Sequence, residues 1–184
     1  FGSLYTTKSE NLVTDPDSAK GLKIRTAGGI IGPEAVKAIG ASSMTVPGSE
    51  LATALQQGVV DGVLSTPIFV NDAKLPVKTL TVVPMFNTVT PVVMSLKTFT
   101  SLPEDLQEIL VQTGKDLEEH AKEEVLKKAE TAYSTLEDNG VEIYYPTEEE
   151  IAEWKEATKP AWEVFENEVE GGKELLEALS ATNE

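Results

Sequence analysis

Short apolar segments alternate with short helical patterns between residues 21 and 83, and turn residues separate each from the next. Pro33 and Gly40 bound one expected helix, and Ser49 is placed to cap a second helix that ends at Gly58. The segments typical of strands are 22–26, 43–46, 59–64 and 79–83. Strands that alternate with helices predict a parallel sheet with helices on its faces and a crevice at one edge. The expected fold class is therefore α/β.

The clearest helical pattern lies in the middle of the chain. Ser101 and Glu104 have the spacing of a capping box, and Asn139 followed by Gly140 ends the pattern. A helix over these positions is about 50 Å long, whereas a small domain is about 30 Å across, so we expect it to connect two lobes. Gly114 lies inside it and favours a bend. One apolar stripe recurs along it: Leu106, Leu110, Thr113, Leu117, Ala121, Val125, Ala129, Ala132 and Leu136.

A further strand and helix are expected after the long helix. Residues 141–145 are typical of a strand, and Thr147 with Glu150 repeats the capping-box spacing at the start of the next helix. Pro160 is expected to kink or split that helix, because proline lacks the backbone donor and clashes with the preceding turn.

Three other expectations concern the second half of the chain. Trp154 and Trp162 share a helical face with Ile151 and Phe165, which favours core or lobe-packing positions over ligand stacking for both tryptophans. Residues 90–96 are expected to be an extended strand-like stretch after the fourth strand. Residues 180–184 are expected to fray at the end of the chain.

The charge and composition of the chain exclude several classes of partner. Fifteen basic and 31 acidic side chains give a net charge of −16, which repels phosphate backbones and anionic lipid surfaces. Nucleic acid and membrane-surface partners are therefore not expected. The absence of cysteine excludes disulfides and thiolate metal sites. No apolar run approaches the roughly 20 residues of a membrane helix, and the start at Phe1 suggests a processed or truncated chain.

The sequence offers little for catalysis. Its one histidine, His120, stands among glutamates on the long helix and is best explained as solvent-facing. The glycines at 28, 29 and 32 do not form GxGxxG, and the loop lacks the lysine of a phosphate loop. No GxSxG motif occurs that would indicate a serine nucleophile. We expect no catalytic residue, no metal ion and no cofactor.

Arg25 is the one arginine in the chain, against 14 lysines, and it lies near the end of the first strand pattern. A guanidinium offers a planar fork of donors that matches a carboxylate. Because parallel strands end on the same side of a sheet, polar groups after neighbouring strands are expected to converge there on one small anion. A surface charge explains Arg25 equally well at this stage. The groups expected to converge are Arg25, Thr26, the amides of Gly28 and Gly29, Ser65 and Thr66.

Several segments in a fixed order carry a resemblance to a known family. The segments GLKIR at 21–25, ALQQGVVDG at 54–62 and Leu102-Pro103 together resemble the substrate-binding protein of a TRAP transporter, the DctP-like family. The resemblance extends over about residues 15–170. It implies a two-lobed periplasmic, extracytoplasmic receptor that closes over a small organic acid and delivers it to membrane permease subunits driven by an ion gradient. In that family an arginine at the position of Arg25 clamps the substrate carboxylate.

The same resemblance implies further ligand contacts, with departures that leave the ligand open. Ser65 is the best counterpart of a polar or aromatic family contact, and Thr66 is the next. Phe86 and Asn87 match a second contact segment. The apolar pair Met85 and Phe86 is compatible with a partly hydrophobic or aromatic acid, and core packing explains it equally well.

The resemblance also implies a division of the chain into lobes. It makes residues 1–90 and 131–184 the second lobe, a periplasmic-binding-protein-like unit with a mixed, mostly parallel sheet. Residues 91–130 would be a crossover strand and long helix belonging partly to a first lobe whose N-terminal part is absent. The stripe from Leu106 to Val125 should then lack part of its cover, so we expect a dimer or another apolar contact through it.

Two other kinds of function remain open from the residues. One is an enzyme in which Arg25 holds a carboxylate while Asp61 or Glu50 acts as a base. The other is a sensory or scaffolding module that uses the same fold. Turnover of a small acid would identify the enzyme, and stoichiometric binding without product would favour the receptor.

Overall fold

The computed structural model describes residues 1–87 and 91–181, apart from the side chain of Glu119. Within them a single sheet of six strands has the order β3-β2-β4-β1-β5-β6. The strands are β1 (Gly2–Thr6), β2 (Lys23–Thr26), β3 (Ser42–Thr45), β4 (Gly62–Ser65), β5 (Thr79–Phe86) and β6 (Glu142–Tyr144). The helices are α1 (Ile31–Ala38), α2 (Gly48–Gln56), α3 (Pro67–Asp72), α4 (Leu96–Thr100), α5 (Glu104–Asp138), α6 (Glu148–Ala157), α7 (Lys159–Glu168) and α8 (Gly172–Ala181). Two 3-10 turns, Ser9–Asn11 and Pro16–Ala19, lie between β1 and β2.

The sheet is mixed and mostly parallel, as the sequence predicts. Strand β2 pairs in parallel with β3 and with β4, and β5 pairs in parallel with β6. The connections through α1 and α2 are the expected βαβ units. Strand β1 is not predicted from the sequence; it runs antiparallel between β4 and β5. The α/β fold class is confirmed.

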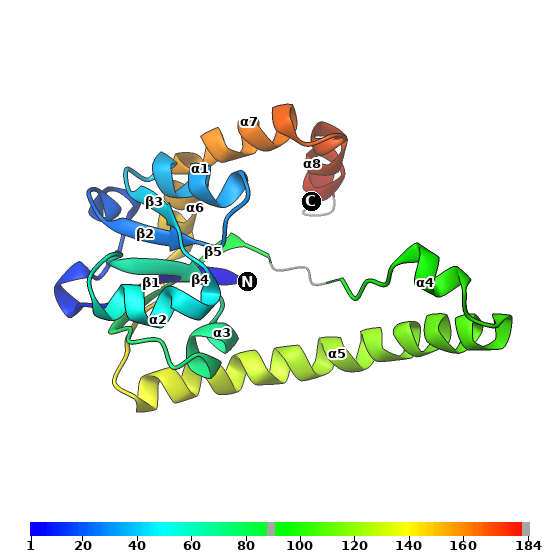
Figure 1. The fold of residues 1–184 in the computed structure, drawn as a ribbon. Helices are drawn as coiled ribbons and strands as arrows, with labels where there is room; N and C mark the ends of the chain where they lie inside the picture. The colour runs from blue at the N-terminus through cyan, green and yellow to red at the C-terminus, as the bar shows by residue number, and fades with distance from the viewer. Residues whose placement is uncertain (88–90, 182–184) are drawn as a thin grey trace.

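The two faces of the sheet carry separate cores (Figure 1). Helices α2, α3 and the C-terminal end of α5 cover one face, and helices α1 and α6 cover the other. The first core includes Tyr5, Val63 and Leu80 from the sheet with Leu51, Leu55, Val70 and Leu136 from the helices. The second includes Leu4, Ile24, Leu64 and Val83 from the sheet with Val36, Ile39 and Trp154 from the helices.

Two expected boundaries in this region are wrong. Ser49 does not cap α2, because the N-cap position is Pro47 and the helix has no side-chain cap. Strand β4 begins at Gly62 and not at residue 59. The amide of Val59 donates to the carbonyl of Ala54, so it closes the end of α2 and cannot join the sheet.

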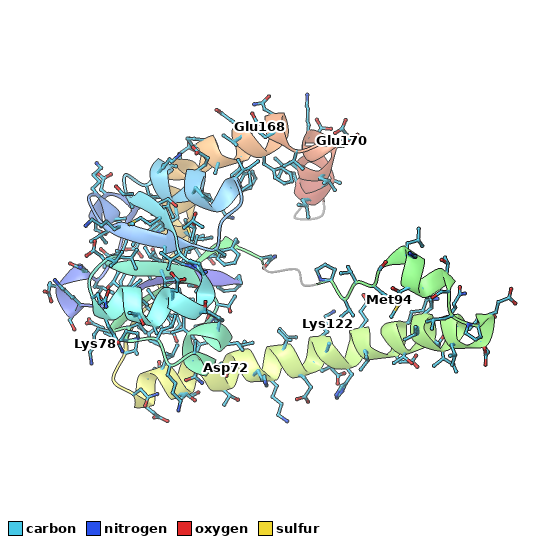
Figure 2. All side chains as sticks on the ribbon, in the orientation of Figure 1. Asp72, Lys78, Met94, Lys122, Glu168 and Glu170 are labelled. Carbon is cyan, nitrogen blue, oxygen red and sulfur yellow. The ribbon has the colours of Figure 1, made fainter. Side chains whose placement is uncertain are left out.

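Helix α5 is a 35-residue rod that runs unbroken through Gly114 and is about 52 Å long at 1.5 Å per residue. Its C-terminal end packs on the sheet through Ala132 and Leu136, whereas every described side chain from 108 to 128 is exposed. The predicted exposure of the stripe is confirmed, with Leu117 55% and Val125 54% exposed. Lys122 in Figure 2 lies on this part of the helix, away from the sheet.

The start of α5 differs from the expected capping box. The helix begins at Glu104 after Pro103 and has no side-chain cap. The Ser101 hydroxyl instead donates to the carbonyl of Thr98 at 2.7 Å, because Ser101 closes the short helix α4. The capping-box prediction for Ser101 is therefore wrong.

The segment between β5 and α5 is not the strand that was expected. Residue 90 lies outside the described residues, residues 91–95 pair with no strand of the described chain, and Leu96 begins α4. Val92 and Val93 are almost fully exposed, and Figure 2 shows Met94 far from the sheet. A strand needs a neighbour for its backbone hydrogen bonds, and this segment has none beside it.

The C-terminal region follows the sequence more closely. Thr147 and Glu150 form the expected capping box of α6, and a break at Thr158, next to Pro160, separates α6 from α7. Trp154 is 2% exposed and lies in the core, as predicted, whereas Trp162 is 48% exposed, so a core position for it is wrong and lobe packing stays a prediction. The expectation of fraying at residues 182–184 lies outside the described residues.

The Tyr144 phenol donates to one Glu150 oxygen at 2.6 Å, and the other oxygen accepts from the Thr147 amide at 2.7 Å. The Tyr144 bond and then the backbone bond hold the pKa of Glu150 below its ordinary value. This stabilisation is therefore present above the unfolded-state pKa of about 4.3 and is lost as pH falls through the folded-state pKa.

We expect Tyr144→Phe to raise the pKa of Glu150 towards its ordinary value. The thermal stability of the variant should then fall less than that of the unaltered protein as the pH is lowered below about 4. Carboxyl NMR titration and thermal unfolding at several pH values measure the two effects. Tyr145→Phe is the matched control, since no hydrogen bond joins Tyr145 to Glu150. An unchanged Glu150 pKa in Tyr144→Phe would contradict the assignment.

The Tyr5 hydroxyl is fully buried and has no hydrogen-bond partner among the described residues. Burial, followed by the nearby Tyr133, raises the pKa of Tyr5 far above its ordinary value. Because a buried unpaired hydroxyl opposes folding, Tyr5→Phe is expected to leave the free energy of unfolding unchanged or to increase it.

Urea denaturation of the Tyr5→Phe variant tests this expectation. Thr79→Val is the control, because the Thr79 hydroxyl is equally buried but is bonded to Thr6 at 2.6 Å, so its removal should cost about 1 kcal/mol. A similar loss in Tyr5→Phe would show that the Tyr5 hydroxyl does have a partner.

Candidate functional site

One edge of the sheet gathers the ends of four neighbouring strands. The parallel strands β2 and β4 end there, and the antiparallel strand β1 begins there, with Ser3 directly opposite Ser65. Strand β5 also ends there, with Phe86 opposite Gly2. Figure 1 shows this edge, marked by the N-terminus, facing the open side of the molecule between α8 and α5. Arg25, Ser65, Phe86 and the following Asn87 thus lie along the same edge.

Arg25 and Ser65 also share a face of the sheet. Arg25 is in register with Val63, which is opposite Tyr5. Because side chains alternate along a strand, Ser65 and Ser3 lie two residues further along the same face. Ser65 is 6% exposed, and its hydroxyl makes no hydrogen bond to any described residue.

Arg25 is a buried cation with an incomplete set of partners. Its side chain is 7% exposed, and its Nε donates to the carbonyl of Val46 at 2.9 Å. Among the described residues no acidic side chain pairs with it, and its two terminal nitrogens make no hydrogen bond. Burial lowers the pKa of Arg25 from its ordinary value, although a guanidinium stays charged at neutral pH.

The explanation of Arg25 as a surface charge is therefore wrong. A buried charge without a counter-ion is costly, and an anion that meets the terminal nitrogens would supply both charge and acceptors. The planar fork is suited to a carboxylate. The position of Arg25 at a strand end, with its Nε held by the backbone after β3, fixes the direction of that fork.

The two threonines named as candidates are engaged elsewhere. The Thr26 hydroxyl is bonded to Ser43 at 3.2 Å, and Thr26 points to the opposite face from Arg25 because it is the next residue in the strand. It is therefore not available to a ligand beside Arg25. The Thr66 hydroxyl accepts from the Phe69 amide at 3.4 Å and caps α3. Gly28 and Gly29 both have positive φ angles, which the turn after β2 requires.

Phe86 lies over the start of β1. It is 37% exposed, and a Cβ atom on Gly2 would overlap its ring, so only glycine fits beneath it. Core packing does not fully cover Phe86, although Met85 is half-buried against the second core. Asn87 is exposed immediately after β5.

Ser3 and Phe69 also lie near this edge, and neither is predicted from the sequence. Ser3 is fully buried, and its hydroxyl has no partner among the described residues. The nearby Tyr133 has its pKa raised by burial, an effect that the Ser3 hydroxyl opposes. Phe69 lies in α3, whose start carries a capping signal in Thr66 followed by proline.

Of the two carboxylates proposed as a base, Asp61 lies away from this edge, whereas Glu50 lies near it in the first turn of α2. Asp61 lies before β4, at the opposite edge, where its carboxylate accepts from the Lys23 amide at 2.9 Å. Glu50 is exposed in the first turn of α2, and His120 is exposed on α5. Among the described residues no group of three His, Asp or Glu side chains is placed to hold a metal ion.

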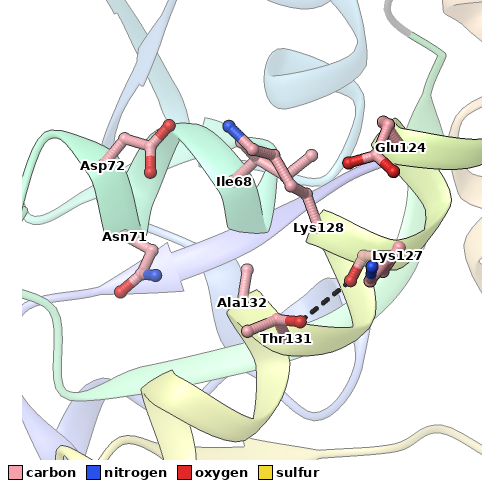
Figure 3. A pocket seen from close by; sticks show the side chains of 8 residues that line it. All are labelled: Ile68, Asn71, Asp72, Glu124, Lys127, Lys128, Thr131 and Ala132. Carbon is pink, nitrogen blue, oxygen red and sulfur yellow. Dashed lines mark hydrogen bonds between the residues drawn. The ribbon is translucent and has the colours of Figure 1, made fainter. Parts of the chain in front are cut away.

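Two surface hollows lie away from Arg25. The hollow in Figure 3, with a volume of about 240 Å³, lies between α3 and α5 and contains Thr131, whose hydroxyl donates to the Lys127 carbonyl at 3.0 Å. The second lies between α4 and the start of α5. Neither is lined by a predicted site residue.

Both a family profile and individual relatives match this chain to bacterial solute-binding proteins. The sequence profile of bacterial extracellular solute-binding protein family 7, DctP, matches residues 2–168. A solute-binding protein of Sulfitobacter sp. strain NAS-14.1 is 29% identical over 175 residues, which cover 94% of this chain and 52% of that protein. The chain thus spans about half the length of this relative.

Solved structures share the fold. A TRAP periplasmic solute-binding protein of Shewanella oneidensis with bound succinate has a TM-score of 0.86 at 22% identity, covering 100% of this chain and 59% of that one. One of Rhodoferax ferrireducens with bound malonate has a TM-score of 0.82 at 25% identity, covering 95% and 56%.

None of the helices in residues 1–87 and 91–181 combines the length and apolarity needed to cross a bilayer. The profile match covers most of the chain, and the six-stranded sheet with its covering helices agrees with the solved relatives. The chain therefore belongs to the DctP family of bacterial extracellular solute-binding proteins.

Proposed function

We propose that this chain is the ligand-gripping second lobe of an extracytoplasmic receptor, which captures a small organic acid and delivers it to a TRAP-type permease. The family membership supports an extracytoplasmic solute-binding role. Malonate and succinate, bound by the two solved relatives, are both small carboxylates. The proposal assigns no catalytic step to the chain.

The single observation that carries the proposal is the environment of Arg25. Its guanidinium is buried at the sheet edge with no acidic partner among the described residues and with both terminal nitrogens unbonded. A ligand carboxylate would accept from these nitrogens, and the Ser65 hydroxyl on the same face would donate to the ligand. Because the chain has a net charge of −16, attraction of an acid depends on this local site.

We assign residues 1–90 and 131–184 to the second lobe and residues 91–130 to the connection with a first lobe. The exposed apolar residues of segment 91–95 and of α5, such as Val92 and Leu117, support this division. The greater length of the relatives supports it as well. Ligand that binds between two lobes better in their closed arrangement would shift the population towards closure.

Two alternatives are separable by one experiment on the full-length protein. Calorimetry with malonate, succinate and other small acids is expected to give stoichiometric binding, and NMR of the recovered acid is expected to show no product. Turnover would favour the enzyme, against which the position of Asp61 at the opposite edge already argues. Saturable binding without uptake by vesicles that contain the cognate permease subunits would favour the sensory module.

A further inference from the structure

Helix α2 begins without a cap beside Arg25. Its N-cap residue is Pro47, which has no amide for the Glu50 side chain to bond, so the capping box found at α6 has no counterpart here. The amides of Gly48 and Ser49 make no hydrogen bond to any described residue, and both residues are exposed. The first turn of α2 therefore presents two free donors at the positive end of the helix dipole.

A hydrogen bond places this turn next to the guanidinium. The carbonyl of Val46 accepts from the Arg25 Nε at 2.9 Å, and Gly48 follows Val46 by two residues, which span at most about 7 Å. Helix α2 also packs on the face of the sheet to which Arg25 points, because its Leu51 shares a core with Val63, the residue in register with Arg25. The start of α2 and the Arg25 fork thus lie at one edge and on one face.

The unpaired guanidinium distinguishes this helix start from an ordinary one. Water usually completes the amides of an exposed first turn, so free amides alone indicate no ligand. Here they lie beside a cation that is 7% exposed and has no acidic partner among the described residues. The described side-chain atoms that are unbonded and sealed from water belong to Ser3, Tyr5 and Trp154, so an anion can still reach the terminal nitrogens of Arg25.

The other polar groups of the edge differ in their distance from Arg25. Ser65 ends β4, the strand next to β2, and its unbonded hydroxyl is on the same face. Asn87 follows β5, which is three strand spacings or about 14 Å from β2, so it is placed for a different part of a ligand. The hydroxyls of Thr26 and Thr66 are bonded within the protein. Ser65 and the α2 amides are therefore the donors on the two sides of the fork.

Glu50 carries a negative charge close to these donors. It lies in the first turn of α2, is exposed, and its carboxylate forms no ion pair with a described residue. The positive end of the helix stabilises this charge, and water and salt screen it. A carboxylate bound at the same turn would be repelled weakly by Glu50, so removal of that charge should strengthen binding.

We infer that the carboxylate held by Arg25 is also held by the start of α2, where the amides of Gly48 and Ser49 donate to the oxygens that the guanidinium leaves free. The inference rests on the proposed function, since it adds donors to the same site. A carboxylate has about four acceptor positions, so an arginine fork and two amides can share it. Gly48 suits this arrangement because it puts no side chain between the ligand and the backbone.

Replacing Gly48 by proline removes the amide and keeps the helix. Position 48 is the first residue of α2, where proline is well accommodated, and Pro47 has φ −54° and ψ 144°, a conformation compatible with a following proline. Calorimetry of the full-length protein with malonate and succinate is expected to show about 10-fold weaker binding in Gly48→Pro, because one hydrogen bond to a charged group is lost. Thermal stability without ligand should be unchanged or higher.

Gly48→Ala is the matched control. It keeps the amide, and its Cβ atom would lie 3.6 Å from the Phe69 ring, an ordinary contact, so affinity should stay the same. Glu50→Gln removes the nearby negative charge and is expected to bind both acids about 3-fold more tightly, with a smaller gain at high salt. Glu142→Gln, at the start of β6 on the opposite edge, should show no such gain.

Contrary results would have distinct meanings. Equal affinity in Gly48→Pro and Gly48→Ala would refute the contact with α2 and leave the Arg25 clamp in place. Equal losses in both would assign the loss to crowding against Phe69 and likewise refute the amide contact. Weaker binding in Glu50→Gln would mean that the ligand presents a hydrogen-bond donor, and not its carboxylate, to this turn. Failure of every small acid to bind the unaltered protein would defeat the proposed function, and this inference with it.

Discussion

Arg25→Ala in the full-length protein is expected to weaken binding of a small carboxylate by roughly 30- to 5,000-fold, since loss of one partner of a buried charge pair costs about 2–5 kcal/mol. The expectation follows from a guanidinium that is 7% exposed and has no acidic partner among the described residues. Isothermal titration calorimetry with an acid that binds the unaltered protein measures the change.

Arg25→Lys separates geometry from charge. Lysine keeps the positive charge but loses the paired donors, and its shorter reach loses the bond to Val46, so affinity should still fall substantially. Lys23→Ala, at the start of the same strand and exposed, is the control and should bind normally. An Arg25→Lys protein with unchanged affinity would refute the carboxylate clamp.

Substitution of Arg25 is expected to weaken ligand binding but not to lower the stability of the ligand-free protein. Arg25→Met retains much of the side-chain length and removes a buried unpaired charge, so ligand-free thermal stability should be unchanged or higher. Thermal unfolding with and without acid measures both effects, and only the unaltered protein should gain stability from the acid. A strong loss of ligand-free stability would contradict this expectation and show that the bond from Arg25 to Val46 outweighs the cost of the buried charge.

Trp154→Ala is expected to cost about 3–5 kcal/mol in the free energy of unfolding, because the substitution opens a cavity in the second core. Trp154 is 2% exposed on α6 and packs with Ile24, Val36 and other residues between the sheet and α1. Urea denaturation measures the loss. Trp154→Phe should lose less, since the indole N–H is buried without a partner among the described residues.

Trp162→Ala is the matched comparison for Trp154. Its side chain is 48% exposed on α7, so the expected loss is much smaller than that at Trp154. Equal losses at the two positions would contradict the assignment of Trp154 to the core and Trp162 to the surface.

The parts of the fold that were predictable are those set by local chemistry. Strand β2 and helix α1 follow from apolar spacing closed by Gly40, whose φ of 77° needs glycine. Thr147 caps α6 because its partner Glu150 is also present and both bonds form. Ser101 has the same spacing with Glu104, yet a competing local bond to Thr98 takes its hydroxyl.

Strand β1 was not predictable in the same way. Its five residues make sense only beside β4 and β5, whose positions in the chain are about 60 and 80 residues away. Pairing over that separation depends on tertiary packing, which single-segment patterns do not contain. The same holds for the segment 91–95, where an extended pattern lacks a neighbour to complete it.

Some residues of the candidate site are predictable from the sequence, and others depend on tertiary packing. Arg25 stands out in the sequence because it is the one arginine at a strand end, and Ser65 follows from the rule for parallel strands. Ser3 and Phe69 depend on register across β1 and β4 and on the approach of α3 to Gly48. Burial of Arg25 without a counter-charge is likewise a property of the assembled sheet.

Helix α5 is attached to the sheet only near its C-terminal end, so a small tilt there moves its N-terminal end much further. Ala132 and Leu136 hold it to the sheet, and some 28 residues extend beyond this fulcrum as a stiff helix about 42 Å long. A tilt of about 5° at the fulcrum would sweep the far tip through roughly 4 Å, by the same helical rise. A small change in the packing of α5 against α3 would therefore produce a displacement of several ångströms at the far end of the helix.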